Sequence, residues 1–197
     1  MVNKTGLRRR RLSLRDRRCE LVQVGVEIIA TRPWDLVTMA DIAAAADVSK
    51  PLLYHYFATK TDLYVAAIGA AAEELRATTR PDPELPPQER LQQALWAHVE
   101  WIAANALAYK AVLQGGVSAD PEVQAIVEES RAEVVQRIAH SLGLERPQPA
   151  LRIALRGWVG FLEGACLDWL TAKDISKVDL VRLLTASLPG AIRAAGV

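Results

Sequence analysis

Hydrophobic residues recur along the whole chain at the three- and four-residue spacing of an amphipathic helix, and no stretch alternates convincingly at the two-residue spacing of a strand. In the first segment, Leu14–Thr31, residues Leu21, Val24 and Ile28 fall on one face. Pro33 ends this helix, because the residue before a proline is pushed out of the α region. The pattern therefore predicts an all-α fold.

Two short helices follow, separated by a tight turn. Thr38 is suited to cap a helix over Met39–Ala46, because its side-chain oxygen accepts a hydrogen bond from a free N–H at the helix start. Ser49 is suited in the same way to cap a helix over Lys50–Tyr56. Two short helices joined by a three- or four-residue turn have the geometry of a helix-turn-helix, and Asp47 tolerates the positive φ that such a turn favours.

Capping and breaking residues locate the remaining helices. Thr59 and Asp62 form a capping-box-like pattern at the start of a fourth helix, which continues to about Thr79. Four prolines between Pro81 and Pro87 then interrupt the chain. Further helices are expected at about Gln88–Leu107, Ala108–Gln114, Pro121–Leu142, Ala150–Ala172 and Val178–Ala195.

Composition favours a globular, cytoplasmic protein. Apolar residues make up 51% of the sequence, and no apolar run approaches the roughly 18–20 residues needed to cross a bilayer. The basic N-terminus lacks the apolar stretch of a secretory signal. Cys19 and Cys166 have no metal-ligand or redox spacing, and each lies in an apolar helical pattern that is typical of a small core residue.

The charges are unevenly distributed. Residues 1–66 carry 11 Lys or Arg and 7 Asp or Glu, a net charge of +4, whereas residues 67–197 carry 13 and 16, a net charge of −3. Eight of the basic residues lie within residues 1–18. This block is either a solvated tail or an arm that binds nucleic acid, since each Lys or Arg that reaches a phosphate releases condensed counterions.

Residues 38–63 closely resemble the signature of the tetracycline repressor (TetR) family of transcriptional regulators. The resemblance is carried by Thr38, by the Ile-Ala pair at Ile42 and by the run Ala46-Asp-Val-Ser-Lys-Pro-Leu-Leu-Tyr-His-Tyr-Phe. It covers about residues 17–67, a third of the chain.

Three residues depart from the family pattern. Pro33 and Asp47 stand where glycine is usual, and both are compatible with the backbone expected there. Pro51 stands where glycine or another small residue often begins the recognition helix, so it changes the surface offered to bases and leaves the operator sequence open.

By this resemblance, the helix over Lys50–Tyr56 lies in the major groove of DNA. Lys50, Pro51 and His55 are then nearest the base edges, where a lysine donates to guanine and a proline packs on a thymine methyl. Tyr54 and Tyr56 are interpreted as contacts to DNA phosphates. The alternative is that they are aromatic residues of the core. The DNA-binding candidates are Thr38, Ser49, Lys50, Pro51, Tyr54, His55, Tyr56, Lys60, Arg8, Arg9, Arg10 and Arg11.

The resemblance also implies that the C-terminal helices enclose a small-molecule effector. Helical pockets are mostly apolar with a few polar groups, although an aromatic stripe at helical spacing is more often core. The pocket candidates are Trp96, His98, Trp101, Tyr109, Gln114, Trp158, Phe161, Glu163, Cys166 and Trp169. Their aromatic, weakly charged character favours an apolar or aromatic effector.

Glu163 lies in the most apolar of the expected helices, so a buried carboxylate there needs a partner. Arg152, Arg156 and a cationic ligand are the candidates for that partner. An ion pair within the helix or across a dimer is the structural alternative.

A homodimer is expected on two grounds. A dimer presents two helix-turn-helix units spaced about one DNA turn, roughly 34–36 Å, and such a pair recognises a near-palindromic site. Small residues among large apolar ones in residues 150–172 and 178–195 also suit close packing in a two-fold four-helix bundle.

The sequence thus predicts a transcriptional repressor that a small effector releases from palindromic, double-stranded operator DNA. An activator or a ligand-independent regulator of the same fold is the alternative, and an unspecific DNA binder is a third reading. The expected parts are a basic flexible arm (1–13), a helix-turn-helix domain (14–59), a connecting helix (60–80) and a ligand-binding and dimerisation domain (81–197).

An enzyme is disfavoured. The three histidines, His55, His98 and His140, have no metal-ligand spacing, and the sequence contains no Gly-x-Ser-x-Gly, Walker or dinucleotide motif. No cofactor, metal or membrane association is expected.

Overall fold

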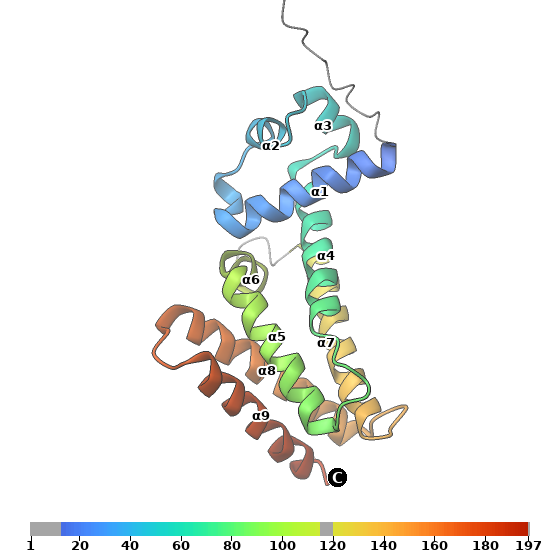
Figure 1. Cartoon of the computed structure of the whole chain (residues 1–197). Coiled ribbons are helices and arrows are strands. Elements are labelled where there is room, and N and C mark those ends of the chain that lie inside the picture. Colours follow the sequence, from blue (N-terminus) through green and yellow to red (C-terminus); the bar gives the residue numbers. More distant parts are fainter. Residues whose placement is uncertain (1–12, 115–119, 197) are drawn as a thin grey trace, which may run out of the picture.

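The computed structural model of the protein describes residues 13–114 and 120–196. In these residues the chain is helical throughout and contains no strand, which confirms the predicted all-α fold (Figure 1). The described elements are α1 (Leu14–Thr31), η1 (Trp34–Leu36, a 3-10 turn), α2 (Met39–Ala45), α3 (Lys50–Tyr56), α4 (Lys60–Thr78), α5 (Pro87–Ala104), α6 (Ala106–Gln114), α7 (Pro121–Ser141), α8 (Pro149–Ala172) and α9 (Lys177–Ala194).

The first three helices bury their apolar sides together, in the N-terminal part of a core that continues through the molecule. Leu21, Ile42 and Leu53 are fully buried in it, and Phe57, which follows α3, joins them. In the turn between α2 and α3, Asp47 takes a φ of 51°, as the sequence predicts. The short helices are stable because each covers the apolar side of the other two.

Helix α4 belongs to both halves of the molecule. Its first turns pack against α1, and its later turns pack against α5 and α7 (Figure 1). The two helices approach closely at Gly25 of α1, where an added Cβ would lie 3.1 Å from Cβ of Ala67. Glycine at position 25 therefore permits this close packing of α1 on α4.

The C-terminal helices form a ring. In the order α4, α5, α9, α8 and α7, each helix packs on the next, and α7 closes the ring by packing on α4. Helix α6 connects this ring to the first unit by packing against α1. The shared α4 and the α1–α6 contact are therefore the two principal contacts between the unit of the first three helices and the ring.

The structure corrects two details of the sequence analysis. The sequence pattern places the boundary between two helices after Leu107. In the structure the boundary lies at Asn105, where α5 ends. Cys19 is exposed on the solvent side of α1, so its interpretation as a core residue is wrong, whereas Cys166 is buried as expected. The apolar face of α1 is formed by Leu21, Val22, Val26, Ile28 and Ile29, and Cys19 does not belong to it.

The close approach at Gly25 generates a stability prediction. Gly25→Val should destabilise the protein by about 1–3 kcal/mol, because the new side chain must push α1 away from the fixed Cβ of Ala67. Gly69→Val in α4 is the matched control, since its Cβ meets only the flexible end of Ile126 at 3.8 Å. Chemical denaturation of both variants measures the difference; equal stabilities would contradict the assigned role of Gly25.

Candidate nucleic-acid interface and C-terminal groove

Side-chain caps fix the start of both helices of the helix-turn-helix. Thr38 Oγ1 accepts a hydrogen bond from the backbone N–H of Asp41 at 3.2 Å, and the Asp41 carboxylate accepts one from the backbone N–H of Thr38 at 2.8 Å. The Thr38 hydroxyl also donates to the Asp41 carboxylate at 2.7 Å, and this hydrogen bond, together with the one from the Thr38 backbone N–H, lowers the pKa of Asp41. Ser49 Oγ accepts from the backbone N–H of Leu52 at 3.3 Å. The predicted caps of α2 and α3 are thus confirmed.

Helix α3 presents its polar side chains to solvent. Lys50, Pro51, Tyr54 and His55 are exposed, while Leu53 on the opposite side is fully buried. The buried side anchors α3 on α1 and α2, so the exposed side is held rigidly outward. A rigid helix with an exposed basic and aromatic face is suited to enter the major groove of DNA.

Tyr56 and Lys60 are placed differently from the rest of the set. Tyr56 is half-buried and packs against the core, with its ring 5.3 Å from that of His55. The Lys60 ammonium donates to the carbonyl oxygens of Trp34 and Val37 at 3.1 and 3.0 Å. In this structure Lys60 therefore ties η1 to the start of α4 rather than extending toward solvent.

Arg18 is a basic residue beside α3 that the sequence analysis did not single out. Its guanidinium lies 5.0 Å from the centroid of the Phe57 ring, at the end of α3, and the residue is exposed. The signal was available in the sequence, because Arg18 lies one turn before the buried Leu21 on the first helix. The candidates Arg8–Arg11 lie outside the described residues.

A groove of about 1400 Å³ runs between the helices of the C-terminal ring. Three of the predicted pocket residues line it: Trp96, His98 and Trp158. Its floor is apolar and includes Leu91, Leu95 and Leu162. The groove exceeds the range of about 300–1,000 Å³ that is usual for small-molecule sites.

The other pocket candidates lie outside this groove. Trp101 and Trp169 are buried, and their indole N–H groups donate to Glu74 Oε1 at 3.1 Å and to the carbonyl oxygen of Ile175 at 2.9 Å. Phe161 is 43% exposed on α8. Gln114 lines a separate cleft of about 280 Å³ between α1, η1 and α6.

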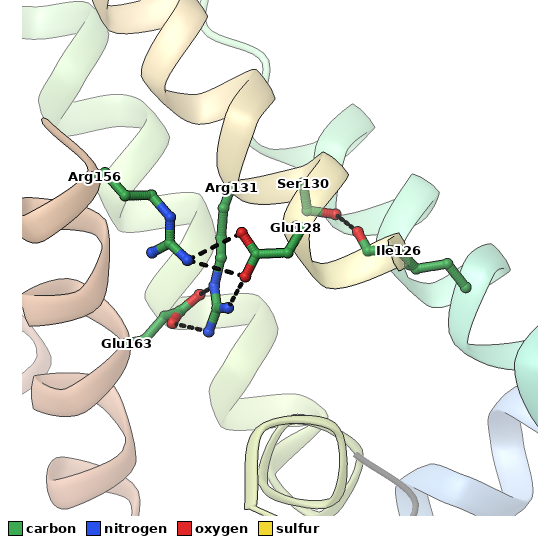
Figure 2. Close-up of polar contacts among 6 residues, drawn as sticks. All are labelled: Ile126, Glu128, Ser130, Arg131, Arg156 and Glu163. Carbon is green, nitrogen blue, oxygen red and sulfur yellow. Dashed lines mark hydrogen bonds and ion pairs between the residues drawn. The ribbon is translucent and has the colours of Figure 1, made fainter. Parts of the chain in front are cut away.

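Glu163 is paired with a residue that sequence reasoning did not consider. Its carboxylate accepts two hydrogen bonds from Arg131 of α7, at 2.8 and 2.6 Å (Figure 2). Arg156 reaches Glu128 instead, at 3.0 Å. The expected partners Arg152 and Arg156 are therefore wrong: the ion pair joins α8 to α7, and Glu163 raises the pKa of Arg131.

His98, which lines the groove, packs against the buried Tyr109, which lies outside the groove lining. Their rings meet edge to face with centroids 5.9 Å apart, and neither His98 Nε2 nor the Tyr109 hydroxyl has a hydrogen-bond partner among the described residues. Burial lowers the pKa of His98 to about 4 and raises the pKa of Tyr109. Cys166 lies close by, where burial raises the pKa of its thiol to about 12. Both aromatic groups are therefore uncharged at neutral pH.

Two negative findings concern the part of the chain that the structure describes. No group of three or more His, Cys, Asp or Glu side chains is arranged to hold a metal ion there. No helix in the same residues has the length and apolar character to span a membrane.

Taken together, the fold and the exposed face of α3 define a helix-turn-helix DNA-binding protein. Residues 21–67 match the family described as bacterial regulatory proteins, tetR family, and residues 87–188 match the tetracyclin repressor-like, C-terminal domain. The second match alone covers more than half of the chain. The chain belongs to the tetracycline repressor (TetR) family, whose members are transcriptional regulators and not enzymes.

Individual relatives agree with this assignment. The HTH-type transcriptional activator FasR of Mycolicibacterium smegmatis is 29% identical over 147 residues, which span 68% of this chain and 64% of that protein. A tetR-family transcriptional regulator from Streptomyces coelicolor has a solved structure with a TM-score of 0.87 at 25% identity, covering 94% of this chain and 84% of that one. A TetR-like regulator from Rhodococcus sp. RHA1 has a TM-score of 0.68 at 25% identity, over 94% and 99%.

The neutral, buried His98 predicts a pH dependence of stability. Its pKa is about 4 in the folded protein and 6.5 in the unfolded chain, so only the unfolded chain binds the proton in that interval. The stabilisation is complete above about pH 6.5 and is lost as the pH falls toward 4, by up to roughly 3 kcal/mol.

Denaturant unfolding between about pH 7 and pH 4 measures this contribution. His98→Phe should show a smaller loss than the unsubstituted protein, because phenylalanine cannot bind the proton. His140→Phe is the matched control at an exposed histidine and should follow the unsubstituted protein. Parallel pH profiles for the unsubstituted protein and His98→Phe would contradict the assignment.

Proposed function

We propose that this TetR-family regulator binds a near-palindromic operator as a homodimer, with one α3 helix in each of two successive major grooves. The observation that carries the proposal is the outward face of α3, where Lys50, Pro51 and His55 are exposed opposite the buried Leu53. Lys50 at the first turn is placed to donate to guanine in the groove. The protein would act where chromosomal DNA is, in the cytoplasm.

Phosphate contacts would hold the helix in register. Tyr54 is 45% exposed on α3, and Thr38 is exposed at the start of α2, where free backbone N–H groups also favour an anion. Arg18 of α1 would add a further phosphate contact beside α3. Lys60 contributes indirectly, by fixing η1 and the start of α4.

The domain division expected from the sequence is part of the proposal. The basic residues 1–13 would serve as a DNA arm, residues 14–59 as the reading head, residues 60–80 as the connection and residues 81–197 as the effector and dimerisation domain. The packing of α4 against α1 on one side and against α5 and α7 on the other supports the connecting role of residues 60–80.

The groove in the ring is the proposed effector site. Helix α4 lines it through Glu73, Arg76 and Thr79, and the same helix packs against α1 of the reading head. An effector that fits one arrangement of α4 better than another would shift the dimer toward that arrangement and change the spacing of the two α3 helices. We favour a repressor that leaves the operator when the effector binds. Activation is the second candidate, because the relative FasR is named a transcriptional activator.

DNA selection with the purified full-length protein tests the interface. We expect enrichment of an inverted repeat, and binding at least about a thousandfold tighter than to unrelated duplex. Lys50→Ala should weaken operator binding by about 1–3 kcal/mol, or roughly 5- to 150-fold, and relax selection at one position of each half-site.

Arg146→Ala serves as the control for Lys50→Ala. It removes the same charge from an exposed residue in the loop between α7 and α8, at the far end of the molecule from α3 (Figure 1). The control should bind the operator with unchanged selectivity. Equal losses in the two variants, or no enriched sequence, would contradict specific reading by α3.

The exposed face of α8 and α9 is the proposed dimer interface. Ile153, Phe161 and Leu183 of these two helices are 61%, 43% and 48% exposed, and a contiguous patch of exposed large apolar side chains is typical of an interface. Gly157 and Gly164 of α8 have open space where a Cβ would stand. A second copy packed here would cover the apolar stripe and complete a four-helix bundle.

Phe161→Glu should weaken dimerisation by at least about tenfold, because each interface would bury two carboxylates without partners. Leu36→Glu is the control, since Leu36 is 74% exposed but lies in η1, away from α8 and α9. Sedimentation equilibrium gives the dimer dissociation constants, and circular dichroism verifies that helical content is kept. A Phe161→Glu protein that is folded and fully dimeric would contradict the assigned interface.

A further inference from the structure

The groove in the C-terminal ring differs in charge from the rest of that region. Residues 67–197 carry 13 basic and 16 acidic residues, yet the described residues that line the groove include six arginines and only two glutamates. The arginines are Arg76, Arg80, Arg90, Arg137, Arg182 and Arg193, and the glutamates are Glu73 and Glu133. Arg182 is exposed and already paired with Asp179 at 2.9 Å, so it does not add to the free positive charge of the groove. A basic groove in an acidic region is suited to an anion.

Both glutamates of the lining form ion pairs with an arginine. Arg76 lies 2.6 Å from Glu73 and 3.3 Å from Glu133, so this one arginine has both acidic side chains of the lining as partners. No comparable excess of negative charge is available in the lining to attract a cation. The groove thus discriminates between ligands by charge.

Arg137 and Arg90 are the arginines best suited to bind an anion, because each is partly buried without an acidic ion-pair partner in the part of the chain that the structure describes. Arg137 is half-buried and donates to the carbonyl oxygen of Thr79 at 3.1 Å, and no carboxylate among the described residues lies within ion-pair distance of it. Burial lowers its pKa; Glu133 opposes this effect, and the nearby Arg80 adds to it. In Arg90, the Nε atom is buried without a hydrogen-bond partner in the described structure.

The remainder of the groove is apolar and long. Leu91, Leu95, Trp158 and Leu162 line it. Along α5, His98 follows Arg90 by eight residues, which corresponds to about 12 Å at the rise of an α-helix. His98 also lines the groove and is uncharged at neutral pH, so it offers nothing to a second ionic group. The groove therefore combines a charged end with an extended apolar path.

We propose that this groove binds an amphipathic anion, with a carboxylate or phosphate head held by Arg137 and Arg90 and an apolar tail lying along α5 toward His98. A guanidinium donates two parallel hydrogen bonds to either head group, which suits it to both. The anion would satisfy donors that are half-buried in the free protein, and the tail would displace water from the leucine and tryptophan floor. The inference deepens the proposed effector role of the groove, but binding itself is measured without DNA.

The test compares ligands that share one chain and differ in the head. The full-length protein is titrated with dodecanoate, dodecyl phosphate, dodecanol and dodecyltrimethylammonium below their micellar concentrations, and tryptophan fluorescence reports binding because Trp96 and Trp158 line the groove. Dodecanoate or dodecyl phosphate should bind at least about tenfold more tightly than dodecanol, and the ammonium compound least tightly. The better of the two anions identifies the head group.

Two arginine variants assign the site. Arg137→Gln and Arg90→Gln should each weaken binding of the preferred anion by about tenfold while leaving dodecanol within about twofold, since only the charged hydrogen bonds are lost. Arg152→Gln, an exposed arginine of α8 outside the groove, is the matched control and should bind as the unsubstituted protein does.

Two results would overturn the inference: dodecanol binding as tightly as both anions, or either arginine variant losing affinity for dodecanol as much as for the anion. Operator binding measured with and without the preferred anion separates this inference from the proposed function. Tight anion binding with unchanged operator affinity would overturn the effector role of the groove and leave the ligand class standing.

Discussion

The contact between α1 and α4 is the constraint on which the rest of the molecule depends. At Gly25 the two helices approach so closely that a single methyl group would lie 3.1 Å from Cβ of Ala67. Helix α1 carries the core on which α2 and α3 are mounted, and α4 forms one wall of the C-terminal groove. Because protein interiors are close-packed, a displacement of α4 cannot be absorbed at this contact and must move α1 as a body. The packing of α1 on α4, closest-fitting where Gly25 faces Ala67, therefore joins the helix-turn-helix unit to a wall of the groove, in addition to the contact between α1 and α6.

Polar contacts complete this connection at both ends of α4. At its start, the Lys60 ammonium donates to two carbonyl oxygens beside η1, which fixes the reading head to the first turn of the helix. At its end, Arg76 joins Glu133 and Thr79 accepts from Arg137, so that α4 is held to α7 at the charged end of the groove. An anion that draws on Arg137 would act directly on the contact between α7 and α4. The proposed ligand chemistry and the proposed regulatory motion thus meet at the same residues.

Local signals predicted much of the fold, and long-range geometry explains where prediction failed. Thr38, Ser49 and Thr59 cap the helices that the sequence assigned to them, because a cap is decided within four residues. The positive φ of Asp47 was predictable for the same reason. The partner of Glu163 was not, because Arg131 is brought to it by the packing of α7 on α8, 32 residues away in the chain. The position of the Lys60 ammonium and the gathering of arginines in the groove likewise depend on how the helices are rotated against each other. Spacing along one helix does not specify this rotation.

Chemical protection of the selected operator tests the central claim, the docking of α3 in the major groove, most directly. Dimethyl sulfate methylates guanine N7 in the major groove and adenine N3 in the minor groove, so protection of each atom reports the groove that the protein fills. The account predicts guanine N7 protection in two half-sites whose centres lie about one helical turn apart, roughly 10 base pairs, on one side of the duplex. Full reactivity of every guanine N7 in a saturated complex, with protection confined to adenine N3, would contradict it.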